Sequence, residues 1–177
     1  MEHIQKRILY SREEIARRVQ ELAREISRDY RDRDVILVCV LKGAFMFLAD
    51  LTRALSIPHT VDFVRLASYG AGTESSGSVT ITKGLDHPVE GKHVLIVEDI
   101  LDTGTTVAYL LELLQEMNPL SVKVCCLIDK KARRKVHCEP AYTGFDVTDG
   151  FLVGYGLDYN ERFRCLSDIY VIEEITP

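Results

Sequence analysis

The sequence lacks any hydrophobic segment of membrane-spanning length. Its apolar runs are all well short of the roughly 20 residues that a spanning helix needs. The N-terminal stretch MEHIQKRILYSREE also contains no apolar core of signal-peptide length. We therefore expect a cytoplasmic protein with no membrane partner.

Cysteines are few and are not arranged as a metal site. There are five, an odd number, and no CxxC pair indicates zinc ligation. Cys39, Cys125 and Cys126 lie inside apolar runs, where a buried thiol packs as a small hydrophobic side chain. These residues therefore predict a packing role.

Positive charge is not in excess. The chain has 22 Lys and Arg against 27 Asp and Glu, which gives a net charge of -5. Proteins that bind nucleic acid normally carry a basic footprint, so we expect no nucleic-acid partner. The exception is the basic cluster KKARRK at residues 130–135, for which a solvated loop is the ordinary interpretation.

Two common nucleotide-binding motifs are also missing. No GKS or GKT occurs, which excludes a Walker A loop, and no GxGxxG indicates a dinucleotide site. What is present is an ordinary globular composition, 46% hydrophobic and 28% charged. A chain of 177 residues suits one compact core, so we predict a single domain over residues 1–177.

The hydrophobic pattern predicts alternating helices and buried strands. Ser11 and Glu14 fit a capping box, and apolar residues then recur at helical spacing up to Ile26. Continuous apolar runs, typical of strands buried on both faces of a parallel sheet, occupy residues 35–41, 93–100 and 121–128. Helical segments at 45–55 and 105–117 separate them.

This alternation predicts an α/β fold with a mostly parallel central sheet flanked by helices. Ligands of such sheets bind at the carboxyl ends of the strands, near the point where the strand order reverses. A strand pattern resumes at residues 60–69, and GAGTESSGS at 70–78 then predicts a mobile loop of the kind that often forms a lid.

The most informative segment is VLIVEDILDTGTT at residues 94–106. Backbone N–H groups at the start of the predicted helix, together with threonine hydroxyls, suit a phosphate group. Three nearby carboxylates, Glu98, Asp99 and Asp102, would repel it. A sugar phosphate resolves the conflict, because carboxylates accept from hydroxyls or coordinate magnesium. The alternative is a polar turn followed by a helix cap.

This segment resembles the phosphoribosyl diphosphate motif of the type I phosphoribosyltransferases. Further segments resemble the hypoxanthine-guanine branch of that family: LKGAFMFLADL at 41–51, Ser68-Tyr69, and FLVGYGLDYNERFRCL at 151–166. The resemblance spans about residues 10–172. It implies the type I phosphoribosyltransferase fold, with a small hood formed by the N- and C-terminal segments.

The resemblance also implies an activity, the transfer of a 5-phosphoribosyl group from phosphoribosyl diphosphate to N9 of hypoxanthine or guanine. This purine salvage reaction yields IMP or GMP and diphosphate. Asp102 would act as base toward N7 of the purine, and Glu98 and Asp99 would hold the ribose hydroxyls. The 5'-phosphate would be cradled by Thr103, Gly104, Thr105 and Thr106.

Departure of diphosphate needs counter-charge. The resemblance implies Mg²⁺ as cofactor and Lys42, Gly43 and Arg164 as diphosphate contacts, with a cis peptide bond before Lys42. Glu98, Asp99 and Asp158 would be the metal ligands. Lys42 could instead be a solvated lysine at a strand end, and either Asp158 or Arg164 could belong to a surface ion pair.

Base selection is expected to depend on Lys130, which directly follows a buried run. An ammonium group has donors only, so it can bond O6 of a 6-oxopurine but not the amino group of adenine. Lys131 is the neighbouring alternative. Phe151 would stack on the purine, unless it belongs to the core. Leu152 would offer backbone groups to the base edge, and Asp158 would lie on its guanine side.

Ser68 and Tyr69 would belong to a lid that excludes water from the reacting centre. The family commonly forms homodimers or homotetramers, which we expect here.

One alternative function is that of a nucleotide-sensing RNA-binding regulator on the same fold, although the acidic net charge disfavours it. Another is a phospho-acceptor receiver domain, in which the acid pair normally opens the chain and no TGTT follows.

Overall fold

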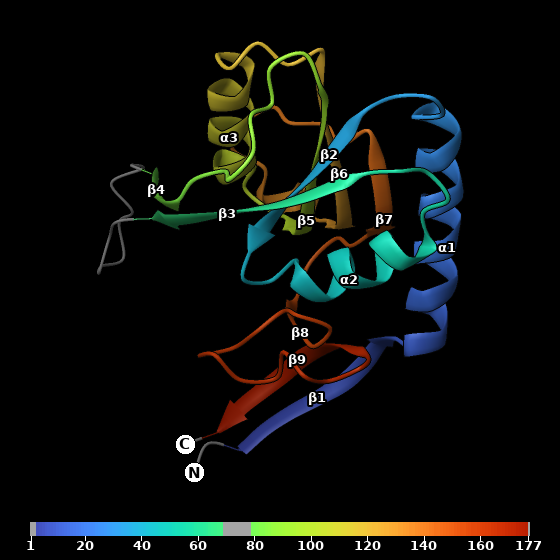
Figure 1. The fold of residues 1–177 in the computed structure, drawn as a ribbon. Coiled ribbons are helices and arrows are strands. Elements are labelled where there is room, and N and C mark those ends of the chain that lie inside the picture. The colour runs from blue at the N-terminus through green and yellow to red at the C-terminus, as the bar shows by residue number, and fades with distance from the viewer. Residues whose placement is uncertain (1–2, 69–78, 177) are drawn as a thin grey trace.

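The computed structural model describes residues 3–68 and 79–176, which form two sheets and the helices around one of them (Figure 1). In chain order the elements are β1 (His3–Tyr10), α1 (Arg12–Asp29), β2 (Val35–Leu41), α2 (Phe45–Ala54), β3 (Thr60–Ser68), β4 (Val79–Lys83), β5 (His93–Leu101), α3 (Thr105–Gln115), β6 (Ser121–Asp129), the short 3₁₀ helix η1 (Lys131–Arg133), β7 (Tyr142–Asp146), β8 (Phe151–Val153) and β9 (Ile169–Thr176).

The central sheet has six strands in the order β4-β3-β2-β5-β6-β7. Each neighbouring pair is parallel except β3 with β4. The predicted α/β fold with a mostly parallel sheet is therefore confirmed. The sequence did not identify the two edge strands, β4 and β7. Both are short and lack a continuous apolar run, since an edge strand is less enclosed than a central one.

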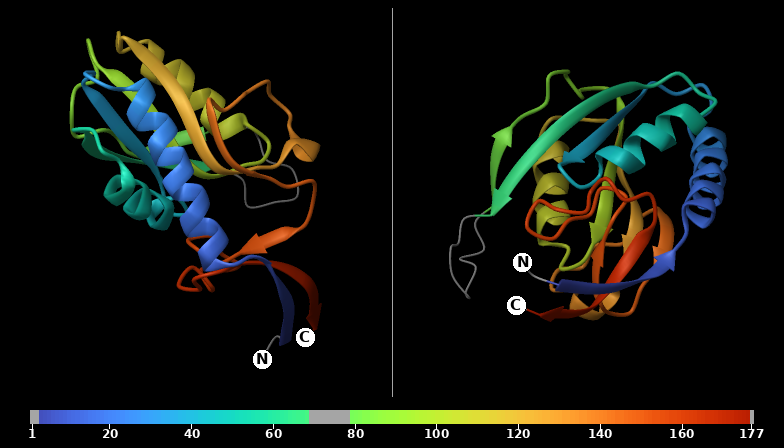
Figure 2. Two further views of the ribbon diagram at one scale, coloured as in Figure 1. Left: turned by 90° about the vertical axis from the view of Figure 1, so that its right-hand side faces the viewer. Right: turned by 90° about the horizontal axis from the view of Figure 1, so that it is seen from below.

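Successive residues of β2 contribute to two different cores. Leu37 and Cys39 pack with α1 and α2, whereas Ile36 and Val38 pack with α3 on the opposite face (Figure 2). Side chains alternate across a strand, so a sheet covered on both faces needs apolar residues at every position. This explains the uninterrupted run, and it buries the Cys39 thiol as expected.

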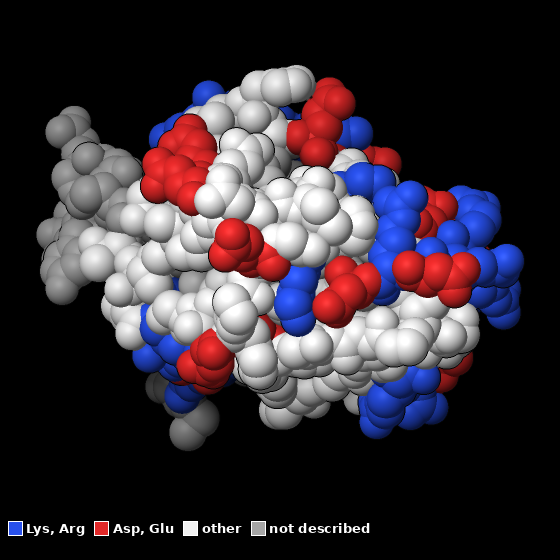
Figure 3. Space-filling model, turned by 45° about the horizontal axis from the view of Figure 1, so that its top comes forward, with Lys and Arg blue, Asp and Glu red and all other residues white. Residues whose placement is uncertain are grey.

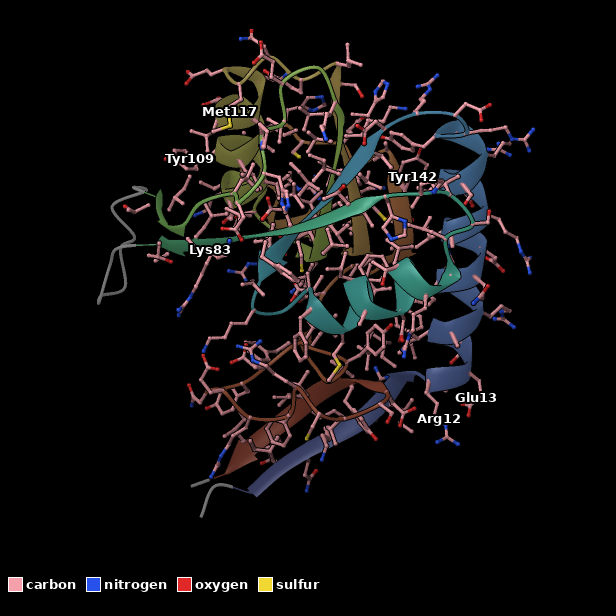
Figure 4. The ribbon with its side chains drawn as sticks, in the orientation of Figure 1. Arg12, Glu13, Lys83, Tyr109, Met117 and Tyr142 are labelled. Atoms are coloured by element: carbon pink, nitrogen blue, oxygen red, sulfur yellow. The ribbon has the colours of Figure 1, made fainter. Side chains whose placement is uncertain are left out.

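The predicted capping box at the start of α1 is present. The backbone N of Ser11 donates to the Glu14 carboxylate at 2.8 Å, and the Ser11 hydroxyl accepts from the backbone N of Glu14 at 3.3 Å. The next backbone N, of Arg12, donates to Asp168 at 2.8 Å. Figure 4 shows Arg12 and Glu13 at this end of α1. The contact fixes the helix to the segment before β9.

The second sheet is antiparallel and has the order β1-β9-β8. It joins the two ends of the chain and lies beyond the carboxyl ends of the parallel strands (Figures 1 and 2). This is the predicted hood. No helix in the described part of the chain is long and apolar enough to span a membrane.

A substitution at Leu95 in β5 tests the contribution of the central core to stability, because this side chain is fully buried. Leu95→Ala should lower the free energy of unfolding by about 2–5 kcal/mol, since the lost contacts leave a cavity. Leu120→Ala is the control, because Leu120 is 65% exposed and should change stability by no more than about 0.5 kcal/mol. Urea denaturation measures both, and equal losses would contradict the core position of Leu95.

Candidate active site

The strand order reverses between β2 and β5. From β2 the chain passes through α2 to β3 on one side, and from β5 it passes through α3 to β6 on the other. The connections therefore diverge and leave room at the carboxyl ends of these two strands. Gly43, after β2, and Asp102, Thr103, Gly104 and Thr106, after β5, line one cavity at this opening.

Gly43 and Asp99 approach each other closely. A Cβ atom placed on Gly43 would lie 1.6 Å from Oδ2 of Asp99, so any side chain there would have to displace the Asp99 carboxylate. The peptide bond before Lys42 is cis, as the resemblance implied. The sequence identified Gly43 as a site residue but gave no sign of its contact with Asp99, because the two are far apart along the chain.

Two acidic residues end the continuous buried run of β5, residues 94–99. Glu98 and Asp99 are both buried, and the Asp99 carboxylate accepts from the backbone N of Ile100 at 2.8 Å. Burial first, and then the adjacent carboxylate of Asp99, raise the pKa of Glu98 well above its usual value. A bound cation or hydroxyl donor would relieve this repulsion.

A cavity of about 250 Å³ lies between this acid pair and the start of α3. Gly104 is the N-cap residue of α3 and adopts φ +82°, a left-handed conformation that glycine tolerates best. Gly104 has no side chain to cap this helix. Within the described residues the Thr105 N–H donates to the Thr103 hydroxyl at 3.4 Å, and the N–H groups that follow in the first turn have no side-chain partner and are available to an anion. The polar lining is Glu98, Asp99, Asp102, Thr103, Gly104 and Thr106. Thr105 begins α3 and does not line the cavity.

A second cavity of about 230 Å³ shares Asp99, Ile100 and Asp102 with the first. Its other lining residues come from the ends of β6 and β8 and from the loop after β8: Lys130, Arg133, Gly150, Phe151, Leu152, Leu157 and Asp158. The four residues that the resemblance assigned to a purine base therefore line one cavity, and Asp102 lies in the wall between it and the first cavity.

Lys130 is 4% exposed, so the solvated-loop interpretation of the basic cluster is wrong for this residue. Its ammonium donates to the backbone oxygen of Gly150 at 2.8 Å, directly before β8. Lys131, the alternative, points elsewhere: it is an exposed side chain that pairs with Asp146 at 3.0 Å. Lys130 immediately follows the last residue of β6, Asp129, and at this strand end its side chain lines the second cavity.

Phe151 is 52% exposed, which excludes it from the core. Its ring lies edge-on to that of Tyr159, with 5.7 Å between the ring centroids. Leu152, the next residue, is buried, as alternation along a strand requires. The side chain of Phe151 is thus held at the cavity while its neighbour anchors β8 to the core.

The two carboxylate oxygens of Asp102 differ. Oδ2 lies 3.3 Å from Nη1 of Arg133, whereas Oδ1 is buried and has no hydrogen-bond partner among the described residues. Most buried polar atoms are hydrogen-bonded, so an unpaired acceptor on a residue that lines both cavities is a feature of functional interest. It can accept a proton or hydrogen bond from a bound ligand.

Lys42 and Arg164 meet through an acidic residue that the sequence analysis missed. The Glu161 carboxylate lies 3.0 Å from Nζ of Lys42 and 3.3 Å from Nη2 of Arg164. Arg164 also pairs with Asp158 at 2.9 Å. Neither Lys42 nor Arg164 lines the two cavities described above. Glu161 lies inside the quoted motif at 151–166, but its charge gave no reason to place it between two cations.

The three predicted metal ligands do not come together. Within residues 3–68 and 79–176, no three His, Cys, Asp or Glu side chains form a potential metal site. Asp158 is instead held by Arg164. The acid pair Glu98-Asp99 fits a divalent cation by its chemistry.

Of the two predicted lid residues, Ser68 ends β3 and Tyr69 lies outside the described residues.

Comparison with known proteins agrees with this geometry. The model of the phosphoribosyl transferase domain family matches residues 6–160. The hypoxanthine-guanine phosphoribosyltransferase of Aquifex aeolicus is 47% identical over 169 residues, which cover 95% of each chain. That of Mycobacterium avium is 45% identical over 95% of this chain and 86% of its own. The chain belongs to the hypoxanthine-guanine phosphoribosyltransferase family.

Solved structures of this family share the fold. A hypoxanthine phosphoribosyltransferase from Staphylococcus aureus superimposes with a TM-score of 0.91 at 41% identity, covering 94% of this chain and 91% of that one. A hypoxanthine-guanine phosphoribosyltransferase from Bacillus anthracis gives 0.90 at 37% identity, covering 98% and 100%. Its crystal holds a HEPES molecule in the active site.

Gly43→Ala tests the contact with Asp99. The added methyl group should displace the Asp99 carboxylate and lower the rate of phosphoribosyl transfer about 100-fold, because small misplacements at a reacting centre have effects of this size. Gly84→Ala is the matched control, since a Cβ atom there meets nothing within 4 Å. Steady-state kinetics on folded protein measures both. Equal rates for the two variants would contradict the proposed constraint.

Proposed function

We propose that this protein transfers the 5-phosphoribosyl group from phosphoribosyl diphosphate to N9 of hypoxanthine or guanine, yielding IMP or GMP and diphosphate in purine salvage. The observation that carries this proposal is the shared wall of the two cavities. Asp99, Ile100 and Asp102 separate a phosphate-type cavity from one that contains Lys130 and Phe151. Relatives of closely similar sequence bear the name of this activity.

The sugar phosphate would occupy the cavity at the start of α3. Its 5'-phosphate would accept from the N–H groups at the helix N-terminus and from the hydroxyls of Thr103 and Thr106. Gly104 would contribute a backbone donor, and the Thr105 N–H, which donates to the Thr103 hydroxyl at 3.4 Å, would turn to the phosphate. Glu98 and Asp99 would accept from the ribose hydroxyls, which offsets part of the desolvation of this buried pair and of the repulsion between its two carboxylates.

Magnesium fits the same acid pair. Mg²⁺ is commonly held by one or two carboxylates together with substrate oxygens, so Glu98 and Asp99 could hold it without a third protein ligand. When bound, the ion supplies positive charge against the leaving diphosphate. The assignment of Asp158 as a further ligand stays a prediction, because this carboxylate pairs with Arg164.

The purine would lie in the second cavity. Lys130 has donors beyond the one used by Gly150, and these suit the O6 acceptor of hypoxanthine or guanine. Adenine presents an amino group at that position, which offers these remaining donors of the buried ammonium no acceptor. Phe151 would stack on the ring, the backbone of Leu152 would bond its edge, and Asp158 would lie on the guanine side.

The chemistry would take place beside Asp102. The bond from the anomeric carbon to diphosphate breaks as the bond to N9 forms, and the open Oδ1 atom accepts the proton from N7 of the purine. Nearby carboxylates stabilise the positive charge that develops on the sugar. Lys42, the backbone of Gly43 and Arg164 would receive the diphosphate. Glu161 would then have to release the two cations.

The alternative, an RNA-binding regulator, gains no support from the face shown in Figure 3. On the face shown in Figure 3, acidic side chains are interspersed among the basic ones, and the basic ones gather on the side where α1 lies. A nucleic-acid site normally presents a continuous basic patch.

We propose self-association as a homodimer or homotetramer. For the Trypanosoma cruzi relative, the oligomeric state has been linked to its C-terminal region.

A direct assay tests the proposed function. With magnesium and phosphoribosyl diphosphate, the protein should convert hypoxanthine or guanine to the nucleotide, and EDTA should abolish turnover. Adenine should be used about 1000-fold or more less efficiently, measured as kcat/KM, because its amino group opposes Lys130. Absence of turnover with both 6-oxopurines would overturn the enzyme assignment, and efficient use of adenine would overturn the role of Lys130.

Asp102→Asn tests the proposed base. The amide cannot take up the purine proton, so kcat should fall about 100- to 10,000-fold while KM for phosphoribosyl diphosphate changes little. Asp34→Asn is the control, because Asp34 is an exposed side chain paired with Lys92. A rise in KM with unchanged kcat would instead assign Asp102 to ligand binding.

A further inference from the structure

Arg134 lies beside the proposed phosphate cradle and is bonded through each of its guanidinium nitrogens. Its Nε donates to the backbone oxygen of Asp102 at 3.0 Å, and Nη2 donates to that of Leu101 at 3.1 Å. Nη1 bonds the backbone oxygen of Cys138, and Nη2 also pairs with the buried carboxylate of Asp129. The side chain is 16% exposed, although the sequence suggested a solvated loop.

These bonds hold consecutive carbonyl groups of the loop that leads into α3. Arg134 holds those of Leu101 and Asp102, while the backbone N–H groups of Lys135 and Val136 donate to Thr103 at 2.9 and 3.2 Å. A phosphate cradle needs its N–H groups directed at the ligand, which requires its carbonyl groups to point elsewhere. The segment containing Arg134 provides that orientation.

Packing gives a second, independent indication that Arg134 supports this loop. A Cβ atom on Gly104 would lie 2.9 Å from Cδ of Arg134 and 2.9 Å from the backbone oxygen of Val136. The loop glycine therefore rests directly against the arginine side chain. Its left-handed conformation and this close approach both depend on the absence of a side chain.

The geometry requires a guanidinium group in particular. Arginine presents five N–H donors in one plane, which allows it to bond three carbonyl oxygens and a carboxylate together. Lysine could still neutralise the buried Asp129, but its single nitrogen cannot reach the carbonyl groups of Leu101, Asp102 and Cys138 at once. Charge pairing and loop orientation can thus be separated by substitution.

We propose that Arg134 is a positioning residue for phosphoribosyl transfer, which holds the backbone of Asp102 and orients the cradle at residues 103–106. The proposal rests on the function proposed above. The segment from Lys130 to Arg134 also connects the two cavities. Lys130 lines the second cavity, and its backbone N–H donates to the backbone oxygen of Leu101, which lines the first, at 2.9 Å.

Three variants test this role: Arg134→Lys, Arg134→Ala, and Arg28→Ala as a control that removes an exposed arginine from α1. Arg134→Lys should fold, because the charge opposite Asp129 is kept, yet KM for phosphoribosyl diphosphate should rise about ten-fold and kcat should fall. The control should match the wild type. Circular dichroism and thermal melting establish that each variant is folded.

Chemical rescue distinguishes positioning from a purely structural role. Arg134 lines a separate cavity of about 390 Å³, through which a small guanidinium ion could reach the vacated position. Millimolar guanidinium, far below denaturing concentrations, should raise the activity of Arg134→Ala several-fold and leave the control unchanged. Wild-type KM in both Arg134 variants, with only the amount of folded protein reduced, would overturn the proposal.

Calorimetric binding of IMP gives a readout that needs no turnover. We expect about ten-fold weaker IMP binding to Arg134→Lys than to the wild type. Equal affinities would overturn the role of Arg134. A wild-type protein that binds IMP but does not turn over would overturn the proposed function alone, and absence of IMP binding by the wild type would overturn both proposals.

Discussion

The close approach of Gly43 to Asp99 is the constraint on which the rest of the site depends. It joins the ends of β2 and β5, the two strands between which the sheet order reverses, with a separation that leaves no space for a Cβ atom. Because both strands are buried on both faces, their backbones resist a shift, and a clash there would fall on the Asp99 carboxylate. The acid pair is thereby fixed at the wall between the two cavities.

The residues of that wall include acidic groups whose burial is unfavourable in the protein alone. Glu98 and Asp99 are buried side by side, which raises the pKa of Glu98, and one oxygen of Asp102 has no partner in the described residues. Such arrangements lower stability and are characteristic of functional sites. Here they suit a ligand that brings hydroxyl groups, a cation and a transferable proton, all of which the proposed reaction supplies.

The basic cluster at 130–135 shows how similar residues acquire different roles. Lys130 follows β6 directly and is buried against Gly150, Lys131 remains exposed, and Arg134 turns back under the loop after β5. Composition alone describes these residues as one charged segment. Their separation depends on which strand end each side chain faces, so base selection and loop orientation can arise from a single short connection.

By itself, the sequence determined the central strands, the capping box of α1 and the residues of the motif at 94–106, because hydrophobic run length and helix caps are local properties. It did not reveal β4, β7, the contact of Gly43 with Asp99, or the roles of Glu161 and Arg134. Arg134 bonds a carbonyl 32 residues away, and Glu161 pairs with a lysine 119 residues away. Only the tertiary structure decided these features, since they exist once distant strand ends are brought together.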